Sequence, residues 1–153
     1  MVKNVGVYPV QGRSVLLHRR FDGVVSTPGG KVDLGEVPVD AAVRELREES
    51  GLRVLPGALR LLYKDTTTVC YAVRVSEDPT GPEPLFRNEI DMAYVAEFPG
   101  ARTVAGTGHA WVPLARLAAH LEARPRTGSH LQAVTELCVL RLDQLTRQIQ
   151  DYL

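Results

Sequence analysis

Short apolar stretches rich in β-branched or aliphatic residues recur along the first two thirds of the chain and predict strands. Residues 5–10 (VGVYPV) and 14–20 (SVLLHRR) flank Gln11, Gly12 and Arg13, an arrangement typical of a hairpin turn. Three further stretches have the same character: residues 58–64 (ALRLLYK), 66–75 (TTTVCYAVRV) and 92–98 (MAYVAEF). We therefore expect a β-sheet that begins with a hairpin.

Two segments carry apolar residues at the spacing of an α-helix. The first covers residues 38–50, where Pro38 suits the first turn and Gly51 suits the left-handed position just after a helix end. The second begins near Leu131, behind a capping pattern that starts at Ser129, and runs to the C-terminus. Its apolar residues are at positions 131, 134, 138, 142, 145 and 149. We expect this helix to lie on the sheet; the alternative is that its apolar face meets a partner chain.

The predicted elements describe a mixed α/β protein in which strands outnumber helices. Residues 76–89 and 99–108 are rich in Pro, Gly and polar residues, so both are predicted to be surface loops. There are no internal repeats, and a chain of 153 residues is within the usual size of one domain. We expect a single domain that spans residues 1–153.

Overall charge indicates no preference for a polyanionic partner. The chain has 18 Lys and Arg against 18 Asp and Glu, a formal net charge of +0, which makes long nucleic acids and anionic membranes unlikely main partners. No stretch is long and apolar enough for a signal peptide or a membrane span, so a cytosolic location is expected. Cys70 and Cys138 lie in apolar stretches without metal-ligand spacing and are interpreted as small buried hydrophobic residues.

The first predicted helix concentrates acidic residues on one side. Glu45, Glu48 and Glu49 lie within about one turn, and Glu36 lies shortly upstream. Like charges at this spacing repel one another, and a divalent cation removes that penalty. Magnesium and manganese prefer oxygen ligands, and magnesium is commonly held by one or two carboxylates together with substrate phosphates. The cluster therefore predicts a metal-phosphate site.

On the helix alone, however, solvated surface charge is the commoner explanation for such residues. Arg44 and Glu48 also have the spacing of an ordinary ion pair. The preceding turn at residues 28–30 (PGG) favours the metal site, because glycines let backbone atoms approach a ligand closely.

The whole segment resembles the signature of the Nudix hydrolases. That signature is a glycine, five residues, a glutamate, seven residues, and then Arg-Glu-aliphatic-any-Glu-Glu-any-Gly-aliphatic. This chain matches it at every position: Gly30, Glu36, Arg44, Glu45, Leu46, Glu48, Glu49, Gly51 and Leu52. A chance match in a chain of this length has a probability on the order of one in ten million. Residues 111–117 (WVPLARL) look like a late strand entering a helix and extend the resemblance beyond the signature.

The resemblance implies an α/β/α sandwich with a mixed sheet and a long C-terminal helix, whose loop-helix-loop binds a divalent metal and cleaves a diphosphate linkage. The implied metal ligands are Glu45, Glu48 and Glu49, together with a backbone carbonyl of Gly29 or Gly30. Glu36 and Arg44 resemble the pair that ties the loop to the helix. The expected cofactor is Mg²⁺, with Mn²⁺ as the alternative, and the expected nucleophile is a water molecule that attacks phosphorus. A homodimer is a further expectation from the resemblance.

The general base stays open between several residues. Glu48 and Glu45 are the first candidates. Many members of the family use a glutamate from a distant loop, but the stretch before Trp111 has His109 at that place. His109 could act as a base or as a donor to phosphate, and it could equally be an ordinary loop histidine. The remaining acidic candidates are Glu89 and Glu97.

The sequence restricts the substrate only to a class. Arg20 and Lys31 are the cations nearest to the signature and could contact phosphate, or could be ordinary solvated charges. Tyr63 and Tyr71 could stack on a base, although aromatic residues in strands more often belong to the core. We expect a small nucleotide or a nucleotide derivative. The alternatives are a regulatory domain that binds a nucleotide without turnover and a structural module that associates through its C-terminal helix.

Overall fold

The chain begins with the predicted hairpin. The computed structural model describes residues 1–20, 25–92 and 100–116. Strands β1 (Asn4–Gln11) and β2 (Ser14–Arg20) pair antiparallel, with Val10 opposite Val15. The two-residue connection contains Gly12 at φ +58°, a backbone conformation that glycine adopts without steric cost. The hairpin prediction is confirmed.

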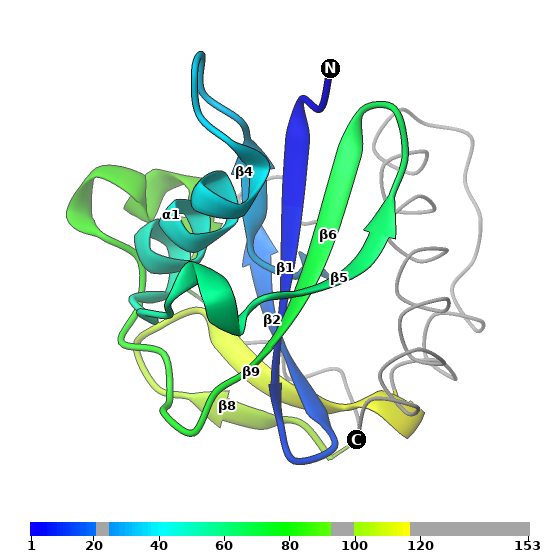
Figure 1. Cartoon of the computed structure of the whole chain (residues 1–153). Helices are drawn as coiled ribbons and strands as arrows, with labels where there is room; N and C mark the ends of the chain where they lie inside the picture. The colour runs from blue at the N-terminus through cyan, green and yellow to red at the C-terminus, as the bar shows by residue number, and fades with distance from the viewer. Residues whose placement is uncertain (21–24, 93–99, 117–153) are drawn as a thin grey trace, which may run out of the picture.

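The hairpin forms the centre of a mixed sheet (Figure 1). Strand β6 (Thr68–Arg74) pairs parallel with β1, and β5 (Arg60–Lys64) pairs antiparallel with β6. On the other side β9 (His109–Pro113) pairs antiparallel with β2, and β8 (Arg102–Val104) with β9. The strand order over the described residues is therefore β5-β6-β1-β2-β9-β8.

Three very short strands extend this sheet toward the acidic segment. Strand β4 (Gly29–Lys31) pairs with β1, while β3 (Val25–Ser26) and β7 (Ile90–Asp91) both pair with β2. All three pairings are antiparallel. As a result, the glycine turn lies directly beside the middle of the sheet.

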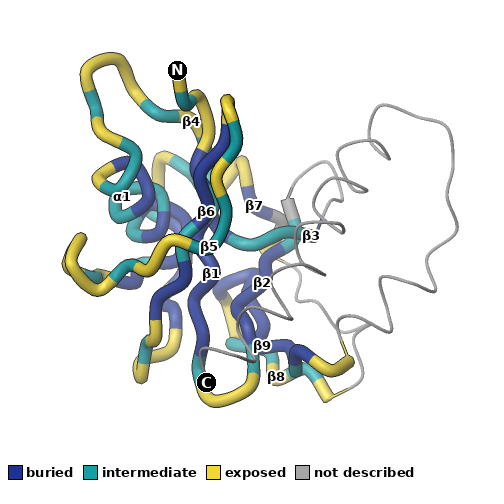
Figure 2. The backbone as a smooth tube through the Cα atoms, turned by 45° about the vertical axis from the view of Figure 1, so that its right-hand side comes forward, coloured by how far each residue is buried: buried dark blue, intermediate teal, exposed yellow. Residues whose placement is uncertain are grey.

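Each face of the sheet carries its own apolar cluster, because successive side chains of a strand point to opposite faces. The helix α1 (Pro38–Ser50) covers one face, where buried side chains of the sheet and helix pack together. They are Val5, Val7, Leu16, Val73 and Trp111 from the strands and Ala41, Ala42 and Leu46 from α1. The cluster on the opposite face includes Tyr8, Val10, Val15, Leu17 and Cys70. Figure 2 shows that burial is concentrated along the central strands.

Helix α1 has the bounds that its sequence predicts. Pro38 is at its first turn, and Gly51 follows it with φ +78° and donates its N–H to the carbonyl of Arg47 at 2.8 Å. The left-handed conformation suits glycine and ends the helix. A short 3₁₀ helix, η1 (Pro56–Ala58), then leads to β5.

Other predicted elements agree less closely with the structure. The predicted loop at 76–89 contains a 3₁₀ helix, η2 (Pro84–Glu89), and the predicted loop at 99–108 contains β8. Only Met92 of the predicted strand at 92–98 is described, and it lies outside any strand. Residues 114–116 are helical after β9, as the resemblance at 111–117 implies. The predicted helix from Leu131, together with Cys138, lies outside the described residues.

Candidate active site

The glycine turn and α1 face each other across a very small gap. The N–H of Gly29 donates a hydrogen bond to Oε2 of Glu49 at 2.9 Å. A Cβ added to Gly30 would lie 2.5 Å from the carboxyl carbon of Glu45, and one added to Gly29 would overlap the backbone of Val5. Gly29 is therefore required sterically, whereas a side chain at position 30 would have to displace the carboxylate of Glu45.

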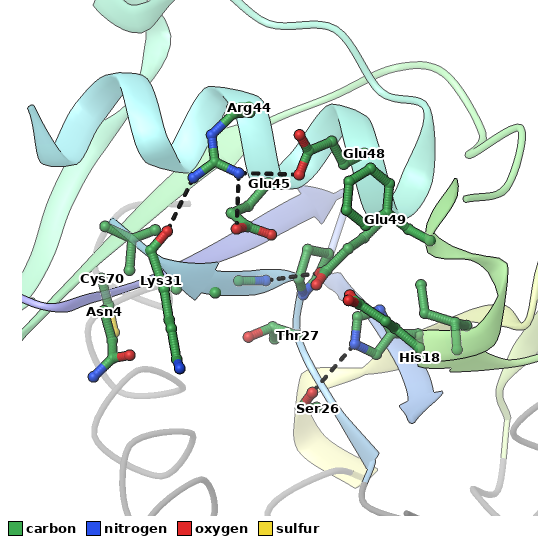
Figure 3. A pocket seen from close by; sticks show the side chains of 18 of the residues that line it. Asn4, His18, Ser26, Thr27, Lys31, Arg44, Glu45, Glu48, Glu49 and Cys70 are labelled. Atoms are coloured by element: carbon green, nitrogen blue, oxygen red, sulfur yellow. Dashed lines mark hydrogen bonds and ion pairs between the residues drawn. The ribbon is translucent and has the colours of Figure 1, made fainter. Parts of the chain in front are cut away.

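Arg44 connects the turn, the following loop and the helix. Its Nε and NH2 donate to the two oxygens of Glu36, each at 2.9 Å, and NH2 also donates to the carbonyl of Lys31 at 2.9 Å. Its NH1 donates to one oxygen each of Glu45 and Glu48, both at 3.0 Å. The planar guanidinium suits this fork geometry, which a lysine could not reproduce. Figure 3 shows Arg44 above Lys31 and Glu45, with Glu48 beside it.

These contacts shift the pKa values of the charged groups. Hydrogen bonds from Arg44 hold the pKa of Glu36 below its ordinary value, and those same bonds raise the pKa of Arg44. Burial raises the pKa of Glu45, and the attraction of Arg44 only partly opposes this effect. The charges of Glu48 and Glu89 raise it further. Arg44 thus neutralises the negative charge of Glu45 only in part, and such an environment favours a bound cation.

The donor set fits a hard divalent cation. The side chains of Glu45 and Glu48 are 13% and 11% exposed, Glu49 is 7% exposed, and all three belong to the same end of α1. Carboxylate oxygens of this kind are the ligands that Mg²⁺ and Mn²⁺ prefer. Within the described residues no three such side chains form a metal-binding group: Glu45 and Glu48 meet at NH1 of Arg44, whereas Glu49 accepts a hydrogen bond from the N–H of Gly29.

A cleft of about 860 Å³ adjoins the acidic cluster. The turn and α1 contribute Gly29, Gly30, Lys31, Arg44, Glu45, Glu48 and Glu49 to its lining. From the sheet, Asn4, Gly6 and Tyr8 of β1 and Thr68 and Cys70 of β6 line it, together with His18 and Ser26. Phe86, Glu89 and Ile90 complete one side. Figure 3 shows the glutamates above the turn and Ser26, Thr27 and His18 below it.

A strap, defined here as residues 78–89, carries Phe86 and Glu89 to this cleft. Backbone N–H groups of Thr80 and Gly81 donate to the carbonyl of Ser50, and that of Glu83 donates to the carbonyl of Glu48. The strap thus satisfies carbonyls at the C-terminal end of α1 that the helix itself leaves without partners. Asp78 fixes its other end, because it accepts hydrogen bonds from the indole of Trp111 at 2.9 Å and from Arg102.

The structure brings together most, but not all, of the residues that the sequence singles out. Lys31 lines the cleft and is exposed, which leaves its ammonium group accessible to a ligand. The backbone of Arg20 pairs with Ile90 beside the cleft, but its side chain lies outside the description, as does Glu97. Tyr63 and Tyr71 are not among the described lining residues, and Tyr63 instead donates its hydroxyl to Asp65 at 2.7 Å.

His109 is not an ordinary loop residue. It begins β9 and is 0% exposed, and burial lowers its pKa to about 4. It is absent from the described lining of the cleft, so the structure does not bring it to where a base or a phosphate donor would act. This burial is not visible in the sequence, because a Gly-rich turn precedes the residue and the burial of β9 comes from tertiary packing.

His18, Tyr8 and Phe86 also line the cleft, although no pattern in the sequence singled them out. His18 and Tyr8 lie in strands whose apolar neighbours made them look like simple core positions. Phe86 lies in a segment that resembles a surface loop, where a single aromatic residue among polar ones was the available signal.

Comparisons with known proteins agree with this geometry. A family model described as NUDIX domain matches residues 2–134. An isopentenyl-diphosphate Delta-isomerase from Jannaschia sp. is 33% identical over 82% of this chain and 71% of its own length. A MutT-like protein from Streptomyces ambofaciens is 36% identical over 46% of this chain and 46% of its own length, so the chain spans less than half of that relative.

A solved structure supports the fold. The crystal structure of a MutT NUDIX hydrolase from Burkholderia pseudomallei has a TM-score of 0.56 and 22% identity, covering 95% of this chain and 98% of the other. The described residues contain no helix long and apolar enough to cross a membrane. Because the family model covers most of the chain and residues of the acidic signature line the cleft, the protein belongs to the Nudix family.

Proposed function

We propose that the protein is a divalent-metal-dependent hydrolase that cleaves the diphosphate linkage of a small nucleotide or nucleotide derivative. The observation that carries the proposal is the buried acidic cluster of α1, held against a glycine turn at the wall of an 860 Å³ cleft. Burying three carboxylates together is costly, and Arg44 contacts only Glu45 and Glu48 and does not cancel the burial penalty of Glu45. A small substrate that brings phosphates to a cation bound there suits the size of the cleft.

Glu45, Glu48 and Glu49 would hold the metal, with a carbonyl of Gly29 or Gly30 as a further ligand. Bound there, Mg²⁺ or Mn²⁺ would supply positive charge for the phosphate oxygens and acidify a water molecule. Arg44 keeps Glu45 and Glu48 in place and anchors the loop through Glu36. Such supporting contacts around metal ligands are commonly worth 10-fold to 100-fold in affinity or activity.

Charge in the cleft assigns the remaining roles. Lys31 and Arg44 both line the cleft; Arg44 is engaged by carboxylates, and we assign Lys31 to a substrate phosphate. Glu48 or Glu45 would take the proton of the attacking water, and Glu89 is the best-placed alternative because it lines the cleft. The buried position of His109 gives it no such role in this proposal.

The non-phosphate part of the substrate would lie against the sheet. Tyr8 and Phe86 offer aromatic surface in the cleft, and Asn4 and Thr68 offer polar side chains from neighbouring strands that pair in register. This mixture suits a nucleoside, which has flat apolar faces and polar edges. Long nucleic acids stay an unlikely partner, and a cytosolic location and a homodimer stay predictions.

The test is a substrate panel with Mg²⁺ or Mn²⁺. Nucleoside triphosphates, sugar nucleotides, ADP-ribose and dinucleoside polyphosphates are incubated with the protein, and phosphate, pyrophosphate and nucleoside monophosphate are measured. We expect metal-dependent cleavage of at least one class, abolished by chelation. If no substrate is cleaved while nucleotides still bind, the protein is instead a nucleotide-binding regulatory domain, although its complete set of acidic residues argues for an enzyme.

A second candidate reaction comes from the isomerase relative, whose named substrate is also a diphosphate. Isomerisation of isopentenyl diphosphate moves a double bond and leaves the diphosphate intact. Adding this compound to the panel separates the two reactions, because hydrolysis releases phosphate and isomerisation does not. The proton NMR spectrum of the product would identify the isomerisation directly.

A further inference from the structure

Two buried histidines lie side by side on neighbouring strands. His18 of β2 and His109 of β9 are register partners and are 2% and 0% exposed. Their ring centroids are 5.2 Å apart, and the rings meet edge to face at 79°. Their side chains lie on the same face of the sheet as Leu16 and Trp111, which belong to the apolar cluster under α1. Apolar side chains would complete that cluster more simply, so these polar rings require a further explanation.

His109 is held rigidly from behind. Its Nδ1 lies 2.6 Å from the carbonyl of Thr107, an atom that can only accept, so Nδ1 carries the hydrogen. The backbone N–H of His109 donates to the hydroxyl of Thr107, and that hydroxyl donates to the carbonyl of Val104 at 2.7 Å. The ring therefore presents a fixed surface to His18.

His18 connects this fixed ring to the glycine turn. Its Nε2 lies 3.3 Å from the hydroxyl of Ser26, its register partner on β3, and this contact is drawn in Figure 3. Strand β3 has only two residues and pairs only with β2 in the described part of the chain, so its backbone anchoring is limited. The contact with His18 adds an anchor at the point where the chain leaves β3.

The turn is thereby fixed at both ends. Ser26 is held by His18, and three residues later Gly29 and Gly30 are paired with β1. From this position the N–H of Gly29 reaches the carboxylate of Glu49 at 2.9 Å. The Pro28–Gly29 peptide is also held by β1, because the N–H of Val7 donates to the carbonyl of Pro28 at 2.8 Å. A shift of Ser26 therefore acts on the N–H of Gly29 through Thr27, by straining that bond.

We infer that His18 is a positioning residue for the metal site: braced by His109, it fixes Ser26 and so the glycine turn that orients Glu49. The inference rests on the proposed function, because it takes Glu49 as a metal ligand. A purely structural role for His18 would lower stability without a selective loss of cation affinity. The two roles can therefore be separated by measuring both quantities.

The experiment measures binding of Mn²⁺ alone, without substrate, to the full chain by electron paramagnetic resonance titration. Ser26→Ala and His18→Phe are compared with the wild type, and Ser14→Ala, the same change at the far end of β2, is the control. We expect about 10-fold weaker Mn²⁺ binding for both variants, as for other groups that support metal ligands. The double variant should be no weaker than the weaker single variant, because both changes remove one contact. His18→Gln, which keeps a hydrogen-bonding side chain, should recover part of the affinity.

Thermal unfolding of each variant accompanies the titration. The inference is overturned if Ser26→Ala and His18→Phe bind Mn²⁺ with wild-type affinity. It is also overturned if their loss of Mn²⁺ binding is explained entirely by the fraction of unfolded protein. If His18→Phe does not fold, Ser26→Ala decides alone, because its half-buried hydroxyl can be removed without a large cavity. If the wild type itself binds no Mn²⁺, the proposed function fails as well, so the two failures are distinguishable.

Discussion

At the scale of single residues, the absence of a side chain at position 30 leaves room for the carboxylate of Glu45. A Cβ added there would lie 2.5 Å from the Glu45 carboxyl carbon, closer than non-bonded atoms approach. We expect Gly30→Ala to displace Glu45 and to lower turnover at least 10-fold, because displacements of about 1 Å near reacting groups can cost on the order of 100-fold. Steady-state kinetics with saturating metal would measure the effect. Gly57→Ala is the matched control, since no atom lies within 4 Å of its added Cβ; equal activity of both variants would contradict the expectation.

Glu48 carries the clearest test of the acidic cluster. The change Glu48→Gln keeps the size of the side chain and removes the charge that would hold a cation. We expect turnover to fall by about 100-fold or more even in saturating Mg²⁺, because a lost electrostatic contact to the reacting groups is commonly worth that much. Glu83→Gln is the control, since Glu83 also ends in a carboxylate but pairs with Arg47 outside the cleft lining. Near-normal turnover of Glu48→Gln would show that the cluster is not the metal site.

The sequence identified the acidic residues because their spacing alone places them on one helix turn. It did not identify His18, Tyr8 or Phe86, because a residue's presence in the cleft depends on which strand or strap lies beside it. The same reason explains His109, whose burial comes from pairing with β2 rather than from its Gly-rich neighbours.

At the scale of elements, α1 was predictable to the residue, whereas the shortest strands were not. Its ends are determined by the local sequence, with Pro38 at the start and Gly51 at the end. Strands β3, β4 and β7 have two or three residues, too few for an alternating pattern, and they exist through pairing with β1 and β2. These short strands are also the ones that place the glycine turn and the strap at the cleft. The acidic helix of the site was therefore visible in the sequence, whereas the strands that support the turn and the strap were not.

Arg44 connects the loop after the glycine turn to helix α1. It joins the loop at Glu36 and Lys31 to the helix at Glu45 and Glu48. Arg44→Lys keeps one positive charge but cannot form these contacts together, so we expect Mn²⁺ affinity to fall by about 10-fold to 100-fold. The titration used for the His18 variants would measure it.

Arg47→Lys is the control for this change. Arg47 lies on the same helix and contacts Glu83 through Nε at 3.3 Å, away from the glycine turn. We expect wild-type Mn²⁺ affinity for Arg47→Lys. If Arg44→Lys also bound Mn²⁺ normally, the guanidinium fork would not be needed to arrange the glutamates.

At the scale of the whole molecule, a formal net charge of +0 coexists with a strongly acidic cleft. Residues from the turn, α1, the strap and the two central strands meet there, although they are distant in sequence. The global charge therefore argues against polyanionic partners but says little about the local site. The sheet order and its parallel β1–β6 pair were likewise invisible in the sequence, because they depend on contacts between distant segments.

The buried pair of histidines also predicts how stability depends on pH. The pKa of His109 is about 4 in the folded protein against 6.5 as its ordinary value. Between these values the unfolded chain binds a proton that the folded protein does not, so the free energy of unfolding falls as the pH is lowered through this window. Protonation would also place a hydrogen on Nε2, which has no hydrogen-bond partner among the described residues. From pH 7 to 4.5 this group should remove roughly 2 to 3 kcal/mol of stability.

Urea unfolding of the wild type and His109→Phe, each at pH 7 and at pH 4.5, would test this dependence of stability on pH. Phenylalanine has a ring of similar size and no ionisable group, so the variant should lose less stability than the wild type on acidification. The difference between the two losses isolates His109, because the other titrating groups are common to both proteins. If both proteins lost the same free energy of unfolding between pH 7 and 4.5, His109 would not stay neutral in the folded state over this range. The ring that His18 contacts would then be charged at pH 4.5.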